Sequence, residues 1–501
     1  MAEAGDVGPR SDDPEGIALL RSALTAANFT YQAVRDTLSV EGVPGRDSAE
    51  MPLYLYLLEG GGALATLIKL FLLALEVPSV EAAEAFDGLS LDRLQAMGVI
   101  TQLDGRVAAA IELVPTDDLL VACDTFQDEF SRPDHVLGVS PSARVLAWLT
   151  VRAPVERALD LGTGNGQQAL LAARHARHVT AIDINPRALS FTGFNAALNG
   201  APPIELREGD LFEPVAGERF DLIVCNPPYV ISPESGVAYR DGGLQGDSFC
   251  ESIVRQLPAY LEDGGVAQVL VSWLHPRGGD WIAPVEGWLE GSGCDGLLIR
   301  YAEHDPLEYA AAWNRPLRKS PELYGAAIRR WIAYFEELGI EAISWGALTM
   351  RRRAGDNWFF PYTSTTDEIS GASEQVLRLF TAQDYLASVS DEELLESVFE
   401  LVSEHRVEQT LKLGGGQELV ERNFLRLDRG LRFEVSIDQP AERVLSLLDG
   451  SRPLRPLLAE AATAVPGLPE ERFVQMALPV VKRMIELGFV VPSGSAKPLG
   501  P

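Results

Sequence analysis

The stretch DLGTGNG, residues 160–166, decides the fold. Its first two residues close the apolar run VERALDL, which has the length of a buried strand, and it directly precedes QQALLAARHA, which has helical spacing. Glycines at such a junction let the backbone turn tightly and let a ligand lie against bare peptide groups. A strand, a glycine turn and a helix in this order predict the start of a sheet flanked by helices.

Further apolar runs alternate with helical stretches after this segment, which predicts βαβ units and a mostly parallel sheet. Together with VERALDL they predict seven strands in an α/β, doubly wound, Rossmann-like domain over residues 131–365, with a helical insertion over residues 305–338. The runs are HVTAID (178–183), PIELREGD (203–210), FDLIVCN (220–226), GGVAQVLVSW (264–273), CDGLLIRY (294–301) and EAISWGALTMRR (341–352).

Both flanks of this domain are predicted to be helical. Residues 16–130 alternate helical patterns with polar breaks and end in apolar runs divided by Asp104-Gly105, which is a hairpin signal. Residues 366–495 are helical in composition and end in a short apolar run after Gly488. Helices followed by a hairpin or a short strand predict a winged-helix-like module on each side, and residues 1–15 are expected to be disordered.

The charge balance bears on possible partners. The chain has 72 Asp and Glu against 42 Lys and Arg, a net charge of −30 at pH 7. Because Lys and Arg that neutralise phosphates supply most nonspecific affinity for nucleic acid, this balance disfavours a nucleic-acid partner without excluding it.

The sequence also indicates a compartment. Its four cysteines lack CxxC spacing, which is typical of a reducing compartment and predicts no zinc site. The N-terminus lacks a secretion signal, and the apolar stretch 64–75 is interrupted by Lys69, is too short to cross a bilayer and is expected to form a buried helix. A cytoplasmic protein without a membrane partner is expected.

Acidic residues mark the ends of the first three strands: Asp160 precedes the glycine turn, Asp183 ends the second run and Asp210 ends the third. A carboxylate at the second strand tip is placed to bind ribose hydroxyls, and one at the third can accept from an adenine amino group. Dinucleotide sites use GxGxxG with a pyrophosphate on the helix N-terminus. GxGxG preceded by an acid favours a positively charged ligand without phosphate, and S-adenosyl-L-methionine is such a ligand.

The segment NPPY, residues 226–229, follows the fourth strand. Consecutive prolines end the strand and hold the Asn226 side-chain oxygen and one carbonyl in fixed directions. Two converging acceptors suit an NH2 group, and Tyr229 can lie flat against a planar amide or base. Because methyl transfer from a sulfonium is an in-line displacement, positioning of the nitrogen should supply most of the rate gain. Hydrogen bonds accepted from its N–H groups would also stabilise the charge that develops.

At these residues a family resemblance emerges. The stretch from about residue 134 to 273 resembles the catalytic domain of class I methyltransferases, in particular the release-factor-type N5-glutamine methyltransferases. DLGTGNG, AIDIN, EGDLF and NPPYV match that family's motifs in order, and residues 240–265 resemble its downstream segment. The resemblance implies cofactor binding by Gly162, Gly164, Asp183, Asp210 and Asn226, and target binding by Asn226, Pro227 and Tyr229. It covers little more than a quarter of the chain, and neither flank resembles the family's small helical N-terminal domain, so the substrate does not carry over.

The candidate site therefore has two parts and no metal. The cofactor would be S-adenosyl-L-methionine, and Leu211 and Phe212 are expected to pack its adenine pocket. The candidate catalytic residues are Asn226, Pro227 and Tyr229. The candidate cofactor-binding residues are Asp160, Gly162, Thr163, Gly164, Asp183, Ile184, Asp210, Leu211 and Asn226.

Two further features are weaker signals. Residues 415–417 read GGQ, the peptide motif that the glutamine methyltransferases modify, but a flexible turn is the better interpretation. Arg351, Arg352 and Arg353 form the densest basic run, with the first and third on one face of a strand. A solvated strand end is the preferred interpretation of this run, and contact with an anionic substrate such as RNA is the alternative.

Three functions fit these residues. The leading hypothesis is N-methylation of a protein glutamine or another amide, with a protein or peptide as substrate. The second is methylation of an exocyclic amine on RNA or DNA, because enzymes that modify adenine or guanine amines share NPPY. The third is a sensor that binds S-adenosyl-L-methionine without catalysis. The sequence does not indicate an oligomeric state.

Overall fold

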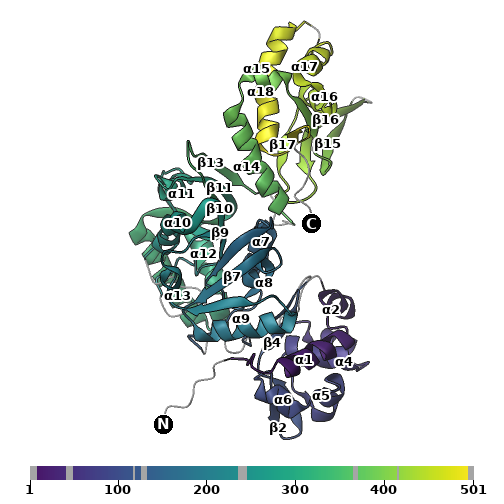
Figure 1. Cartoon of the computed structure of the whole chain (residues 1–501), viewed down its shortest axis with the longest axis vertical. Helices are drawn as coiled ribbons and strands as arrows, with labels where there is room; N and C mark the ends of the chain where they lie inside the picture. The colour runs from purple at the N-terminus through teal and green to yellow at the C-terminus, as the bar shows by residue number, and fades with distance from the viewer. Residues whose placement is uncertain are drawn as a thin grey trace. The chain divides into compact units, whose positions relative to one another are not determined.

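The computed structural model describes residues 8–40, 49–116, 119–125, 132–234, 245–364, 371–414, 417–465 and 467–494. The chain divides into two compact units, one formed by residues 1–147 with 154–362 and the other by residues 148–153 with 363–501. Figure 1 shows the course of the chain through both. Residues 1–7 of the predicted disordered start and residues 240–244 of the family-like segment 240–265 lie outside the described residues.

The first unit contains a mixed eight-stranded sheet with the order β13-β11-β12-β10-β9-β6-β7-β8. Pairing from β8 through β7, β6 and β9 to β10 is parallel, and β12 runs antiparallel between β10 and β11. The strands are β6 (Val155–Leu161), β7 (Ala176–Asp183), β8 (Ile204–Glu208), β9 (Phe220–Cys225), β10 (Leu261–Pro276), β11 (Cys294–His304), β12 (Ile340–Arg352) and β13 (Phe359–Thr363).

Seven of these strands coincide with the seven predicted apolar runs, so the Rossmann-like sheet is confirmed. Strand β13 was not predicted. It contains Pro361, and proline within a strand is confined to positions such as an outer strand, which is where β13 lies. Its short run FFPYT therefore gives little strand signal.

Helices lie around this sheet and connect its strands (Figure 1). Most residues of β9 are buried, as expected of a parallel strand covered on both faces. The predicted insertion between β11 and β12 consists of α12, a short 3-10 helix (Arg315–Lys319) and α13. The helices are α7 (Pro141–Leu149), α8 (Gln167–Ala172), α9 (Pro186–Asn199), α10 (Ser248–Tyr260), α11 (Ala283–Leu289), α12 (Pro306–Trp313) and α13 (Pro321–Leu338).

The insertion contacts the chain just after NPPY. Its Tyr309, Trp331 and Phe335 are buried in one cluster with Val230 and Ile231. The Tyr309 hydroxyl accepts a hydrogen bond from the Ile231 N–H at 3.0 Å. The insertion therefore holds the backbone that follows the candidate catalytic residues.

The N-terminal module belongs to the same unit. A β2–β3 hairpin turns at Asp104-Gly105, so this predicted hairpin is confirmed, and the apolar stretch 64–75 is largely buried, as predicted. Strands β1 (Val77–Pro78), β3 (Arg106–Ala109) and β2 (Ile100–Leu103) form one sheet, and β4 (Glu112–Pro115) pairs with β5 (Leu120–Cys123). The helices are α1 (Pro14–Ala26), α2 (Tyr31–Leu38), α3 (Met51–Leu57), α4 (Ala63–Leu67), a π-helix (Ile68–Leu72), α5 (Ser79–Ala85) and α6 (Leu91–Ala96).

The second unit contains helices, as expected, together with strands that the sequence did not predict. A long antiparallel hairpin, β15 (His405–Gly414) with β16 (Gln417–Leu427), pairs with β17 (Glu434–Ser436). Strand β14 (Val398–Leu401) lies between β18 (Asp449–Pro453) and β19 (Val490–Pro492). The helices are α14 (Ser373–Ser388), α15 (Asp391–Glu396), α16 (Gln439–Ser446), α17 (Leu454–Ala462) and α18 (Glu470–Glu486).

Of the GGQ motif, only Gln417 lies within the described residues, at the end of the β15–β16 hairpin. Gly414 pairs with Gln417 in the register, whereas Gly415 and Gly416 lie outside the described residues.

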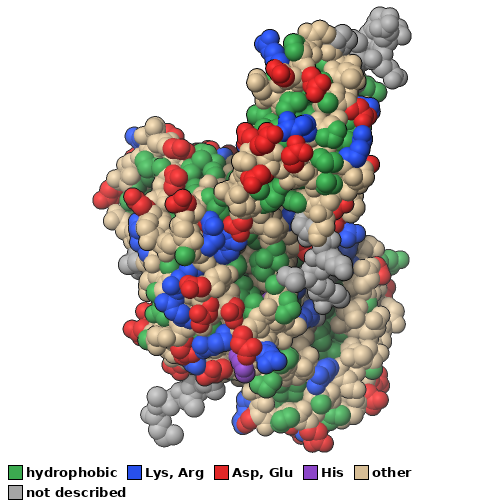
Figure 2. Space-filling view, turned by 45° about the horizontal axis from the view of Figure 1, so that its top comes forward, with side chains coloured by type: hydrophobic (Ala, Val, Ile, Leu, Met, Phe, Trp, Pro, Cys, Tyr) green, Lys and Arg blue, Asp and Glu red, His purple; other side chains and the backbone are tan. Residues whose placement is uncertain are grey.

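Figure 2 shows Asp and Glu side chains spread over the visible face of the molecule. In the part of the chain that the structure describes, no helix combines the length and the apolar character needed to cross a membrane.

Candidate functional site

The glycine turn between β6 and α8 has an open side. Gly162, Gly164 and Gly166 have φ values of +72°, +56° and +82°, which glycine adopts without strain. A Cβ atom on Gly162 or Gly164 would meet no described atom within 4 Å, whereas one on Gly166 would lie 2.8 Å from Thr192 Cγ2. The first two glycines therefore leave room for a ligand, and the third lets α8 and α9 pack closely.

The turn is fixed by the neighbouring strand β7. The N–H groups of Gly162 and Thr163 both donate to the Ile182 carbonyl at 2.9 Å. The Gly164 N–H donates to Asp183 Oδ2, also at 2.9 Å. The second predicted acid thus braces the backbone of the glycine turn.

Asp160 is buried beneath the turn. Its Oδ2 accepts hydrogen bonds from the Thr163 hydroxyl at 2.8 Å and from the Ala169 N–H at 2.9 Å. Burial, with a smaller contribution from the Asp183 charge, raises the pKa of Asp160 to about 7. The carboxyl group of Asp160 therefore titrates close to neutral pH.

Asp183 connects three strand ends. In addition to Gly164, its carboxylate accepts from the Asn185 N–H at 2.9 Å, and its backbone carbonyl accepts from the Gly209 N–H at 3.1 Å. Burial raises the pKa of Asp183, and the hydrogen bonds that its carboxylate accepts from the Asn185 and Gly164 N–H groups partly offset that rise. The next residue, Ile184, is 64% exposed although it is apolar.

The end of β8 differs in part from the expected adenine pocket. Asp210 is exposed, and Leu211, with φ +44°, is half-buried. Phe212 is buried and stacks on Tyr260 with 4.3 Å between the ring centroids. Its ring therefore packs in the core beside α10, and only Leu211 of the expected pair keeps surface exposure.

Strand register places the predicted segments at one edge of the sheet. Leu161 is paired with Ile182 on β7 and with Cys225 on β9, and Asp183 is paired with Glu208 on β8. The glycine turn, the second acid and NPPY thus follow directly neighbouring parallel strands. Ligands of such sheets bind outside the carboxyl ends of the strands.

The NPPY segment combines a free polar group with a packed aromatic ring. Asn226 is half-buried, and its side chain makes no hydrogen bond to the residues that the structure describes. Pro227 is buried, and Tyr229 packs against the core cluster around β9 and α10. Burial raises the pKa of Tyr229, and a hydrogen bond with Ser142 partly offsets that rise. Within the described residues, NPPY thus presents one unpaired amide beside a packed ring.

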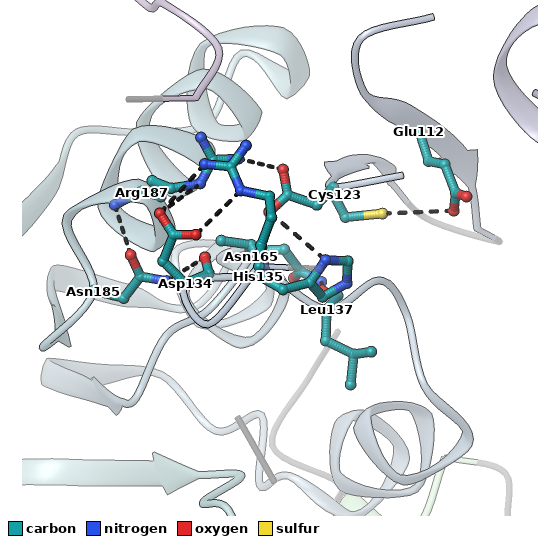
Figure 3. A network of polar contacts seen from close by, with 11 residues as sticks. Glu112, Cys123, Asp134, His135, Leu137, Asn165, Asn185 and Arg187 are labelled. Atoms are coloured by element: carbon teal, nitrogen blue, oxygen red, sulfur yellow. Dashed lines mark hydrogen bonds and ion pairs between the residues drawn. The ribbon is translucent and has the colours of Figure 1, made fainter. Parts of the chain in front are cut away.

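Sequence reasoning missed the residues that hold the start of α9. Asn185 caps this helix by accepting from the Arg187 N–H at 3.0 Å, and its Nδ2 donates to the Asp134 carbonyl at 2.9 Å. Arg187 also forms a buried ion pair with Asp124. Figure 3 shows Asp134, Asn185 and Arg187 gathered in this network. An asparagine before a proline is a local signal for a helix cap, but nothing local indicates its distant partners.

The interpretation of the basic run as a solvated strand end is wrong. Arg351 and Arg353 both bind the fully buried carboxylate of Asp295, with their Nε atoms 3.1 and 3.0 Å from Oδ2. Arg352 donates instead to the Leu261 carbonyl at 2.7 Å. Arg351 and Arg353 thus neutralise Asp295, and Arg352 ties the end of β12 to β10, which argues against a role in binding an anionic substrate.

Comparisons with known proteins find methyltransferases that are similar to the region containing the glycine turn and NPPY. Residues 139–272 match the methyltransferase small domain, and residues 26–110 match a domain of unknown function, DUF7059. The ribosomal protein uL3 glutamine methyltransferase of Bradyrhizobium diazoefficiens is 40% identical over 126 residues, which cover 22% of this chain and 40% of that protein.

Two release factor glutamine methyltransferases are similarly close. That of Xylella fastidiosa is 33% identical over 158 residues, covering 29% of this chain and 52% of the relative. That of Geobacter sulfurreducens is 40% identical over 128 residues, covering 23% and 45%. The chain thus spans about half the length of the curated relatives it matches. Over residues 139–272 it carries a methyltransferase small domain, and this catalytic region resembles the release-factor and ribosomal-protein glutamine methyltransferases.

Proposed function

We propose that the chain is an S-adenosyl-L-methionine-dependent N-methyltransferase whose acceptor is the side-chain nitrogen of a protein glutamine. One observation carries this proposal. Neighbouring strands β6, β7 and β9 end at the same sheet edge, which brings the glycine turn, Asp183 and Asn226 together. The names of the curated relatives support a protein glutamine as the acceptor.

The residues at this edge fit the cofactor. Gly162 and Gly164 present bare backbone next to open space, and backbone N–H groups hold the Asp183 carboxylate at the end of β7, where a carboxylate can bind ribose hydroxyls. The exposed apolar side chain of Ile184 offers a contact surface for adenine, and Asp160 adds negative charge for a cationic ligand. When bound, S-adenosyl-L-methionine supplies an electrophilic methyl group on its sulfonium.

The NPPY segment would position the acceptor nitrogen. The Asn226 side-chain oxygen and a backbone carbonyl of this segment would accept hydrogen bonds from the two N–H groups of a glutamine amide. These bonds orient the nitrogen and favour localisation of its lone pair, which is otherwise delocalised into the carbonyl. Pro227 and the packed Tyr229 ring would keep both acceptors rigid.

We also propose that the flanking modules are winged-helix-like and that the protein acts in the cytoplasm. The sheet order β1-β3-β2, with α5 and α6 before the β2–β3 hairpin, supports this for residues 16–130. Strands β14, β18 and β19 with α17 and α18 support it for part of residues 366–495. Scattered cysteines support a reducing compartment.

A labelling experiment tests the acceptor. The chain is incubated with cell extract and S-adenosyl-L-methionine labelled in its methyl group, and the products are divided between protease and nuclease treatment. We expect the label to be released by protease and to resist nuclease. Release by nuclease alone would favour an exocyclic amine of RNA or DNA, and cofactor binding without transfer to either polymer would favour a sensor.

A pair of variants tests the assignment of roles. Asn226→Ala should lower the transfer rate about 100-fold, because the nitrogen loses its positioning, while cofactor affinity falls less than in Asp183→Ala. Asp183→Ala should instead weaken cofactor binding, measured by calorimetry, because the ribose contact and the brace of Gly164 are both lost. Near-normal turnover of the Asn226 variant would contradict the positioning mechanism.

A further inference from the structure

Helix α9 is shared between the methyltransferase domain and the N-terminal module. It begins directly after Ile184 and Asn185, at the candidate cofactor site. Its buried aromatic and apolar side chains then enter the core of the N-terminal module. This core includes Ile17, Leu20 and Leu24 of α1 together with Phe191, Phe194 and Leu198 of α9. The module is therefore packed onto the helix that starts at the second acid.

Asn195 of α9 links the module to the glycine turn. Its Oδ1 accepts from the Ala122 N–H on β5 at 2.8 Å, and its Nδ2 donates to the Ala122 carbonyl at 2.9 Å. The same Nδ2 donates to the Asn165 carbonyl in the glycine turn at 2.8 Å. Asn195 is fully buried, so these bonds are shielded from water.

The side chain of Asn165 provides a second link. Its Nδ2 donates to the Leu137 carbonyl at 2.9 Å, and its Oδ1 accepts from the Gln167 N–H at 3.0 Å. Leu137 lies in the segment that joins β5 to α7. The glycine turn is thus held both by β5 and by the connecting segment.

The connecting segment is itself anchored by buried charges. The Asp124 carboxylate pairs with Arg187 and accepts from the Val136 N–H at 2.8 Å. Asn185 donates to the Asp134 carbonyl, as described above. Asp124 and Arg187 are 4% and 3% exposed, so separating them would leave a charge uncompensated inside the protein.

We infer that the N-terminal module has the function of holding the cofactor site. Strand β5 of this module and the adjoining residues 132–138 fix the glycine turn, and Asn195 is the positioning residue that connects β5 with the turn. This inference rests on the proposed function, since it assigns the turn to S-adenosyl-L-methionine. It gives a role to the region that follows the DUF7059 match and precedes the methyltransferase small domain.

Asn199 offers a matched control one helical turn away. Its side chain binds both backbone groups of Leu120 on β5, as Asn195 binds those of Ala122. It accepts from the Leu120 N–H at 2.9 Å and donates to the Leu120 carbonyl at 2.8 Å. Its remaining bond goes to the Asn195 carbonyl, and none of its bonds within the described residues reaches the glycine turn. Loss of Asn199 therefore loosens β5 at Leu120 and leaves in place the side-chain bonds of Asn195 to Ala122 and to the glycine turn.

The experiment compares Asn195→Ala with Asn199→Ala in the full chain. Calorimetry measures the Kd for S-adenosyl-L-methionine, and hydrogen exchange measures protection of residues 162–166 in the protein without cofactor. We expect Asn195→Ala to raise the Kd about tenfold and to speed exchange in the turn, because one buried hydrogen bond to the turn is lost. Asn199→Ala should leave both readouts close to wild type at a comparable loss of thermal stability.

A second pair of variants keeps the test valid if the alanine variants do not fold. Asn195→Asp and Asn199→Asp preserve volume and the acceptor for β5, but an aspartic acid donates at most one hydrogen bond in place of the two from the amide. At position 195 one of the bonds to the Ala122 and Asn165 carbonyls is therefore lost, so only the first variant should affect the turn. Equal Kd values for the two positions, with normal binding by wild type, would overturn the role of Asn195 alone. Failure of the wild-type chain to bind the cofactor would overturn the proposed function and, with it, this inference.

Discussion

Cofactor binding should release a proton from Asp160. Without a ligand, burial raises the pKa of this carboxyl group to about 7, so it is mostly protonated at pH 6 and mostly ionised at pH 8. A positive charge within about 4–6 Å lowers a carboxyl pKa by roughly 1–3 units. Binding of a sulfonium and an ammonium beside the turn would therefore favour the ionised form, and the affinity should rise with pH.

The size of the effect follows from this shift. If binding lowers the pKa of Asp160 from about 7 by roughly two units, the Kd at pH 6 should be about tenfold higher than at pH 8. Calorimetry in buffers of different ionisation enthalpy should detect release of nearly one proton at pH 6 and almost none at pH 8.

Asp160→Asn is the control, because it removes the titrating group while the cofactor's own amine titrates as before. The variant should bind more weakly at pH 8 and lose the proton release at pH 6. A wild-type Kd that does not change between pH 6 and 8, or equal proton release by the variant, would refute a cationic ligand next to Asp160.

The remaining predictions concern packing around the turn. Gly166→Ala should destabilise the protein by about 2–3 kcal/mol in chemical unfolding, because its Cβ would lie 2.8 Å from Thr192 at a positive φ. Gly162→Ala meets no described atom, so it should cost only the strain of its positive φ, about 1–2 kcal/mol, and should also lower cofactor affinity. Normal cofactor affinity in this variant would contradict the assignment of the open side. Arg187→Met should cost about 3–5 kcal/mol by leaving Asp124 charged and buried, and Asp124→Leu in the same chain should restore most of that loss. A double variant no more stable than Arg187→Met would show that the ion pair is not the cause.

The tertiary structure contains strands whose sequences have no clear strand pattern. Strand β13 is short, contains a proline and exists because the edge of β11 is there to pair with it. The β15–β16 hairpin lies in a region whose composition is helical, and its strands are stabilised by each other across the register. Pairing partners of this kind supply the stabilisation that local propensity does not.

The sequence by itself determined the parts of this protein that depend on neighbouring residues. Glycines required by positive φ values, prolines that end a strand and apolar runs between helices all act over a few positions, so the sheet and the order of the candidate site residues could be derived from the printed chain. Only the tertiary structure decided what holds that site. The bonds of Asn195 to Ala122 and Asn165, and the pairing of Asp124 with Arg187, join residues far apart in the chain. Such contacts form only when α9 packs into the N-terminal core, which no local pattern specifies.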